Sequence, residues 1–280
     1  MARSENAVKA LDMDDCLITA FNAARTGAGR LLDAYADHAK GRWEGRAPSS
    51  EGPGRDSERE LRRTVYEAFP DHPIYVKGGP PPGEAPDLFW VADPLDGPWS
   101  FRRGSPFFAV SLALVGKGPS GGPETLLGVV LAPVLMELFW AISGGGAFQW
   151  RQVPGIGLCE GPISVSDCGR LESAAVRTGL AAPGPEGREP LKRVQDAAMA
   201  LAAEESASLS LAYVAGGRAE GYFQGEGGLW SAAAGALLVS EAGGKVTGMN
   251  GDPYLPGEEG GILATNGILH GKLAEILVRG

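Results

Sequence analysis

The sequence predicts an α/β fold with a mixed β-sheet in each half of the chain. Three observations support this prediction. Apolar residues follow a helical period between residues 7 and 69, apolar runs separated by turn residues follow from 88 to 143, and strand-like and helix-like segments then alternate. No clean linker divides the chain. We therefore expect an N-terminal half, residues 1–150, and a C-terminal half, residues 151–280, in one compact unit.

The N-terminal region should contain two helices. Residues 7–40 carry apolar side chains at helical spacing, and residues 57–69 repeat this pattern until Pro70 ends it. The intervening segment, residues 41–56, is rich in Gly, Pro, Ser and charge, which predicts a flexible loop.

The next elements should be strands of an antiparallel meander. Their apolar runs are separated by turn residues, at 88–93, 107–115, 125–134 and 136–143. A loop with a short strand is expected at 161–167. The C-terminal half then alternates, with strands expected at 174–179, 210–217 and 260–265, and helices at 189–203, 229–242 and 267–278.

Composition excludes several classes of function. The net charge is −9 and the basic residues are scattered, so nucleic acid is not an expected partner. Apolar runs fall far short of the roughly 20 residues that a membrane span needs, and the polar, acidic start does not resemble a signal peptide. Three widely spaced cysteines without a CxxC pair suit a reducing compartment, so we expect a cytoplasmic protein.

The most specific pattern is WVADPLDGPWSF, residues 90–101, in which Asp93 and Asp96 flank a Pro-Leu dipeptide after an apolar run. It resembles the first signature of the inositol monophosphatase family. Further segments follow in the family's order: SPFFAVSLALV, then GPISVS, SLSLAYVAGGRAEGYF and LWSAAAGALLVSEAGG. The resemblance covers about residues 10–278. It implies the layered α-β-α-β-α sandwich of the inositol monophosphatase and sugar phosphatase fold, a site between the halves, and a homodimer.

The resemblance also implies Mg²⁺-dependent hydrolysis of phosphate monoesters, with carboxylates from several segments as ligands. Five acidic positions are expected, and only Asp93 and Asp96 keep an acid. Gly54, Lys77 and Ser231 occupy the other three. The Leu95 carbonyl remains as a third residual ligand candidate.

Two further positions depart from the family. Pro98 replaces the threonine that helps to orient the water, and it has neither a hydroxyl nor an N–H. Gln224 replaces a glutamate that contacts substrate.

Lys77 is the most informative substitution, because a fixed ammonium would repel a divalent cation by several kcal/mol at an effective dielectric of about 20. We hypothesise that Lys77 pairs with Asp93 or Asp96 and replaces the metal as their counter-charge. A solvent-exposed loop lysine is the simpler alternative. A Schiff-base lysine is disfavoured, since adjacent carboxylates raise the pKa that a nucleophilic amine needs lowered.

The predicted site therefore has Asp93, Asp96 and Lys77 as catalytic candidates, with no metal or other cofactor expected. Its substrate-binding candidates are Gln224, Ser231, Trp99 and Arg102. Most also have a structural interpretation: an inherited turn for the aspartates, a helix cap for Ser231, filling of the vacated pocket for Trp99, and a solvated turn for Arg102.

Three functions remain open. The first is a remodelled cleft that acts on a small polar or anionic metabolite, in a biosynthetic pathway. The second is a non-catalytic subunit that completes or stabilises a partner enzyme. The third is a Mg²⁺-dependent phosphatase whose ligands are displaced in the alignment. Its replacement acids would be Asp56, Glu84 or Asp87, with Glu220 and Glu226 as further candidates near the second-half segment.

Overall fold

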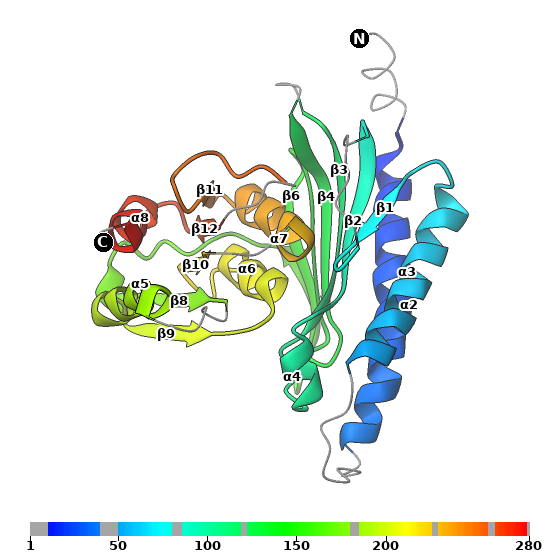
Figure 1. Cartoon of the computed structure of the whole chain (residues 1–280), viewed down its shortest axis with the longest axis horizontal. Helices are drawn as coiled ribbons and strands as arrows, with labels where there is room; N and C mark the ends of the chain where they lie inside the picture. The colour runs from blue at the N-terminus through cyan, green and yellow to red at the C-terminus, as the bar shows by residue number, and fades with distance from the viewer. Residues whose placement is uncertain are drawn as a thin grey trace.

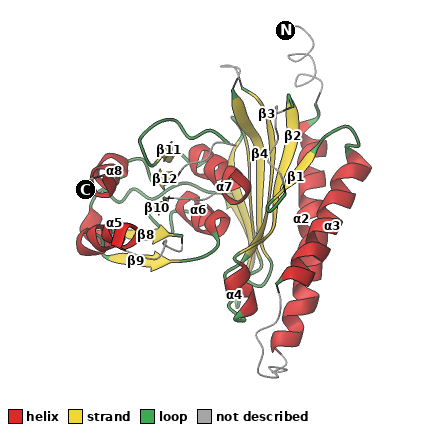
Figure 2. Ribbon diagram, in the orientation of Figure 1, coloured by secondary structure: helices red, strands yellow, loops and turns green. Residues whose placement is uncertain are grey.

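A computed structural model describes residues 11–39, 50–79, 86–118, 122–179, 185–225, 229–256 and 261–278. The chain forms five layers, in the order helices, sheet, helices, sheet, helices (Figures 1 and 2). This is the layered α-β-α-β-α sandwich that the sequence predicted. None of the described helices is long and apolar enough to cross a membrane.

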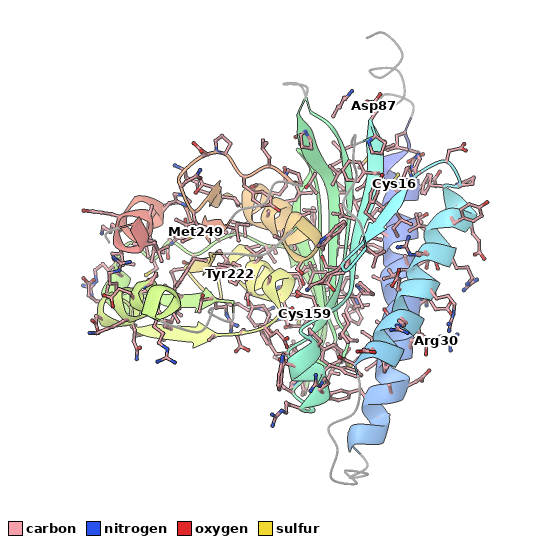
Figure 3. All side chains as sticks on the ribbon, in the orientation of Figure 1. Cys16, Arg30, Asp87, Cys159, Tyr222 and Met249 are labelled. Atoms are coloured by element: carbon pink, nitrogen blue, oxygen red, sulfur yellow. The ribbon has the colours of Figure 1, made fainter. Side chains whose placement is uncertain are left out.

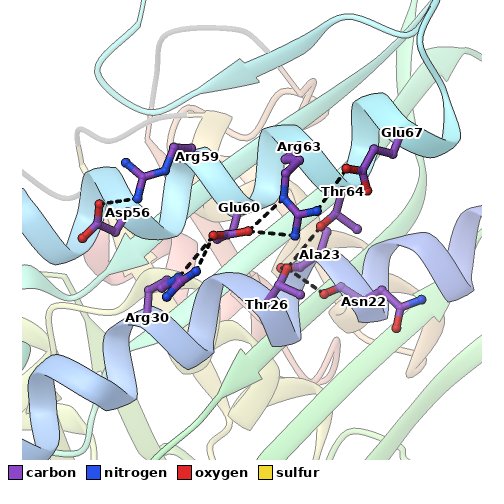
Figure 4. A network of polar contacts seen from close by, with 10 residues as sticks. All are labelled: Asn22, Ala23, Thr26, Arg30, Asp56, Arg59, Glu60, Arg63, Thr64 and Glu67. Carbon is purple, nitrogen blue, oxygen red and sulfur yellow. Dashed lines mark hydrogen bonds and ion pairs between the residues drawn. The ribbon is translucent and has the colours of Figure 1, made fainter.

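The outer helical layer consists of α2 (Met13–Ala39) and α3 (Glu51–Ala68). Their apolar faces pack with one face of the first sheet in a core that includes Leu31, Leu61 and Trp90. On the outside, Glu60 of α3 accepts hydrogen bonds from Arg30 of α2 and from Arg63 (Figure 4). Because both arginine side chains are about half exposed, water screens these ion pairs and they contribute little to stability.

The first sheet has seven strands in sequence order, and only the β1–β2 pair is parallel. Its strands are β1 (Ile74–Val76), β2 (Leu88–Asp96), β3 (Ala109–Lys117), β4 (Pro123–Ala132), β5 (Glu137–Ile142), β6 (Gly146–Val153) and β7 (Gly157–Pro162). The short helix α4 (Pro98–Arg102) follows β2. The expected division after residue 150 falls inside β6, and the first sheet continues to Pro162.

Helices α6 (Ala207–Ala215) and α7 (Leu229–Glu241) form the middle layer (Figure 1). They pack between the two sheets in the largest apolar core, which includes Phe139 and Leu211. Tyr222 of the second sheet also reaches this core and is fully buried (Figure 3). Gly128 of β4 is required here, since a Cβ atom would stand 2.8 Å from the Ala234 backbone of α7.

The second sheet has the strand order β11-β12-β10-β8-β9 and combines parallel and antiparallel pairs. Helices α5 (Pro185–Ala197) and α8 (His270–Val278) cover its outer face. Its strands are β8 (Ala175–Thr178), β9 (Ala200–Ala203), β10 (Gly221–Gln224), β11 (Lys245–Gly248) and β12 (Ile262–Thr265), and a 3₁₀ turn (Leu171–Ser173) precedes β8.

Three local predictions were wrong. Residues 200–203 were expected at the end of a helix, but they form the strand β9. Residues 210–217 were expected as a strand, but 207–215 form α6. Apolar residues surround this helix because it is buried on all sides, so neither a helical nor a strand period is visible. Residues 51–56 were expected in a loop, but they form the first turns of α3, where Pro53 is tolerated because its missing N–H has no intrahelical partner.

The short strand expected within residues 161–167 is the end of β7, which spans Gly157–Pro162. The sequence did not indicate β1, β6, β9, β10 and β11 as separate elements. The three cysteines are free thiols. Figure 3 shows Cys16 and Cys159 on different elements.

Candidate functional site

Asp93 and Asp96 lie at the end of β2, each with 1% of its surface exposed. In a regular strand, residues three apart point to opposite faces of the sheet. Here the register shifts between them, since Asp93 pairs with Ser111 and Asp96 with Ala109. The resulting bulge adds one residue to β2 and turns both carboxylates toward the same side.

Gly97 makes the turn out of β2 possible. Its φ is +99°, in the left-handed region, and a Cβ atom would lie 3.0 Å from the carbonyl oxygen of Phe107. Only glycine meets both conditions without strain. The chain then enters α4, which carries Trp99 and Arg102.

Lys77 reaches the two aspartates because of the parallel pairing between β1 and β2. Its N–H donates to the Ala92 carbonyl at 3.0 Å, so its side chain emerges beside Asp93. The Lys77 Nζ donates to Asp93 Oδ2 at 2.7 Å and stands 4.0 Å from Asp96 Oδ1. The Lys77 side chain is 44% exposed, whereas both carboxylates are buried.

Ser231 joins this centre from α7, 154 residues away from Lys77 in the sequence. The Ser231 hydroxyl donates to Asp93 Oδ2 and lies 3.1 Å from Lys77 Nζ. Ser231 lies inside α7 and not before its first residue, and its hydroxyl donates to the aspartate. The helix-cap interpretation of Ser231 is therefore wrong. The other oxygen of Asp93 accepts the N–H of Leu95 at 3.3 Å.

Asp96 is held by serines that sequence reasoning missed. Its Oδ2 accepts the Ser206 hydroxyl at 2.8 Å, the Ser208 N–H at 2.8 Å and the Ser208 hydroxyl at 2.6 Å. Ser206 is the N-cap of α6 and also accepts the N–H of Leu209. The S-x-S spacing before an apolar run was a capping signal, but interpreting 210–217 as a strand obscured it.

Burial and charge shift the pKa values of this centre in a consistent way. Burial alone would lower the pKa of Lys77, but the charges of Asp93 and Asp96 outweigh it and raise that pKa to about 12. Burial, followed by the charge of Asp93, raises the pKa of Asp96 to about 6, against the opposing effects of Lys77 and the two serine hydroxyls. The lysine is therefore a firmly held cation, whereas Asp96 titrates close to neutrality.

Helix α4 and the segment before α6 contact each other near Lys77. Trp99 is 48% exposed, and the Arg102 guanidinium lies 4.7 Å from its ring centroid. Arg102 Nε is buried without a hydrogen-bond partner among the described residues. The N–H of Ser100 donates to Glu205 Oε2 at 2.9 Å.

Gln224 and Gly54 are two positions at which the family resemblance expects an acidic residue. The Tyr222 hydroxyl donates to Gln224 Oε1. The nearest atom to a Cβ built on Gly54 is Leu95 Cδ2, at 3.9 Å. The helix α3 therefore brings Gly54 beside the aspartate turn, where the resemblance expects an acid.

The proposed replacement acids lie elsewhere or make structural contacts. Asp56 pairs with Arg59 on the surface of α3. Asp87 pairs with Lys117 where β2 begins (Figure 3). Glu220 accepts the Ser166 hydroxyl at 2.9 Å and the Ala175 N–H at 2.6 Å.

Glu84 and Glu226 lie outside the described residues. Within the described part of the chain, no group of three or more His, Cys, Asp or Glu side chains is placed to hold a metal ion.

Comparison with known proteins gives one consistent family. The model of the inositol monophosphatase family matches residues 12–280. The Nus factor SuhB of Pasteurella multocida is 35% identical over 204 residues, covering 70% of each chain. The chloroplastic phosphatase IMPL1 of Arabidopsis thaliana is 31% identical over 261 residues, covering 90% of this chain and 67% of the relative.

Solved structures of similarly named proteins have the same fold as this chain. The inositol monophosphatase of Anabaena (Nostoc) superposes with a TM-score of 0.77 at 27% identity, covering 96% of this chain and 97% of the other. The suhB protein of Bartonella henselae gives a TM-score of 0.78 at 29% identity, covering 94% and 98%.

Proposed function

The chain belongs to the inositol monophosphatase family, and we propose that it is a member in which Lys77 has replaced the divalent ions and the remodelled cleft serves a small polar or anionic metabolite. The observation that carries the proposal is the contact of Lys77 Nζ with Asp93 Oδ2 at 2.7 Å. A cation bound this closely to one aspartate and 4.0 Å from the other already compensates their charge.

The donor set does not suit Mg²⁺. Mg²⁺ needs six oxygen ligands, usually with one or two carboxylates free to coordinate it. Here Asp93 Oδ2 receives the Lys77 ammonium and the Ser231 hydroxyl, and Asp96 Oδ2 receives three further donors. A metal would have to displace an ion pair whose lysine stays protonated at every physiological pH, since its pKa is about 12.

The same groups limit the reactions that the cleft can perform. Lys77 is too firmly protonated to act as a nucleophile or a base. Asp96, whose pKa is raised to about 6, is the acid/base candidate, with Lys77 as the group that stabilises negative charge. We assign Asp93 the role of holding Lys77 and Ser231, and we propose that Gln224, Ser231, Trp99 and Arg102 contact the ligand.

A second candidate, a non-catalytic subunit of a partner enzyme, is favoured by the internal saturation of the site. The polar atoms of Asp93, Asp96 and Lys77 bind mainly one another and nearby serines. Such a centre would stabilise the fold without chemistry. We also propose that the protein is cytoplasmic and that it forms a homodimer or associates with a partner enzyme.

Phosphate release from sugar, inositol and nucleotide monophosphates, with and without Mg²⁺, tests the proposal. We expect no Mg²⁺-dependent turnover by the wild-type chain. Clear Mg²⁺-dependent turnover would show that it is an ordinary phosphatase. Co-purification with an enzyme that loses activity when this chain is removed would favour the second candidate.

Restoring the acids tests the same idea from the opposite direction. The variant Lys77→Glu/Ser231→Asp should bind Mg²⁺ in calorimetric titration where the wild-type chain does not. Lys117→Glu is the control, because it makes the charge change of the Lys77→Glu substitution on an exposed lysine that pairs with Asp87. If the double variant gains no more Mg²⁺ affinity than this control, the assignment of Lys77 and Ser231 to the metal positions is wrong.

A further inference from the structure

Residues 204–206 connect β9 to α6, and their side chains contact three different elements. Glu204 pairs with Arg177 of β8 at 3.8 Å. Glu205 accepts the N–H of Ser100 of α4 at 2.9 Å. The Ser206 hydroxyl donates to Asp96 Oδ2 of β2 at 2.8 Å. The segment therefore fixes α4 and both sheets to one another.

The carboxylate of Glu205 lies in an environment suited to a bound anion. The backbone N–H of Ser100 points at it, and the charges of Lys77 and Arg102 act on it. Burial raises the pKa of Glu205, while the backbone of Ser100 and Trp99 and these two cations oppose the increase. Backbone N–H groups next to cations commonly bind phosphate or carboxylate ligands in proteins.

We infer that Glu205 is a resident anion that excludes phosphate and other small anions from the cleft. A backbone N–H that already donates to a carboxylate cannot donate equally well to a ligand, and the negative charge of Glu205 repels a second anion at the same place. Glu205 is thus a specificity-determining residue. This inference rests on the proposed function, because Glu205 completes a site in which Lys77 already stands in for the metal.

The inference narrows the ligand class. With Glu205 in place, a phosphate ester would have to displace the carboxylate from Ser100 before it could bind. An uncharged polar molecule, such as a polyol, does not meet this obstacle. The cleft should therefore prefer uncharged polar ligands to their phosphate esters.

Calorimetric titration with inorganic phosphate in the presence of EDTA tests this role. We expect weak or undetectable binding by the wild-type chain and at least about tenfold tighter binding by Glu205→Ala, since loss of one close charge and one competing acceptor readily changes affinity by this factor. Glu204→Ala is the matched control. It removes the neighbouring carboxylate, which pairs with Arg177 and not with Ser100, and it should behave like the wild-type chain.

Glu205→Gln guards against misfolding, because it keeps the shape of the side chain and an acceptor for the Ser100 N–H while it removes the charge. A folded Glu205→Ala or Glu205→Gln variant with phosphate affinity unchanged from the wild-type chain would overturn the inference. So would a wild-type chain that binds phosphate as tightly as the variants. The titration involves no metal and no turnover. Mg²⁺-dependent activity would therefore refute the proposed function while leaving this result to be judged separately.

Discussion

Replacing Lys77 with methionine tests the central ion pair directly. The variant keeps most of the side-chain volume but leaves Asp93 and Asp96 buried without their counter-charge. Removing one partner of a fully buried ion pair costs about 3–5 kcal/mol, whereas an exposed pair is worth about 0–1 kcal/mol. Because the aspartates are buried but Lys77 is 44% exposed, water screens part of the effect, and we expect a loss of about 2–3 kcal/mol at pH 8.

The loss should depend on pH in a defined direction. The pKa of Asp96 is already raised to about 6, above the value of about 3.9 for an aspartate in an unfolded chain. The native state therefore holds more protons than the unfolded state between these pH values, and stability falls as the pH rises through this window. The charge of Lys77 lowers the pKa of Asp96, so its removal should extend the window above pH 6. The effect of Lys77→Met should be smaller at pH 5 than at pH 8.

Urea unfolding followed by tryptophan fluorescence at pH 5 and pH 8 measures both effects. Lys117→Met is the control, because Lys117 pairs with Asp87 and both side chains are about half exposed. It should cost no more than about 1 kcal/mol at either pH. Equal losses for Lys77→Met and Lys117→Met, or a Lys77→Met loss that does not change with pH, would refute the argument that Lys77 compensates buried charge.

Three further substitutions test a support of the site, the turn after β2 and the helix α2. Ser208→Ala removes a hydroxyl that donates to Asp96 at 2.6 Å, so urea unfolding should show a loss of about 1.5–3 kcal/mol at pH 8 and less at pH 5; an unchanged midpoint would contradict this. Gly97→Ala must adopt a φ of +99° and place its Cβ 3.0 Å from the Phe107 carbonyl oxygen, so it should lower stability by about 2 kcal/mol or more, and a neutral result would show that the turn can relax. Gly29→Ala lies inside α2 with no atom within 4 Å of the new Cβ, so it should raise stability by about 0.5–1 kcal/mol, which thermal unfolding can detect.

Much of the architecture could be predicted because its signals are local. The apolar runs of β2, β3, β4 and β5 are each contained in ten residues or fewer, and the strong period of the N-terminal helices needs no distant partner. Most errors fell where tertiary burial removes the pattern, as in α6, or where strands are only three or four residues long, as in β1 and β9. Short strands owe their existence to the neighbour with which they pair.

The sequence by itself determined the family, because a motif is a matter of which residue stands at which position, and on the same ground it predicts the loss of acids at Gly54, Lys77 and Ser231. Tertiary structure alone decided what those residues contact. The bonds from Ser208 to Asp96 and from Lys77 to Ser231 join positions 112 and 154 residues apart, and the Glu205 contact with Ser100 spans 105. No local pattern encodes such contacts, since they depend on how the helices α6 and α7 pack between two sheets that form from different halves of the chain.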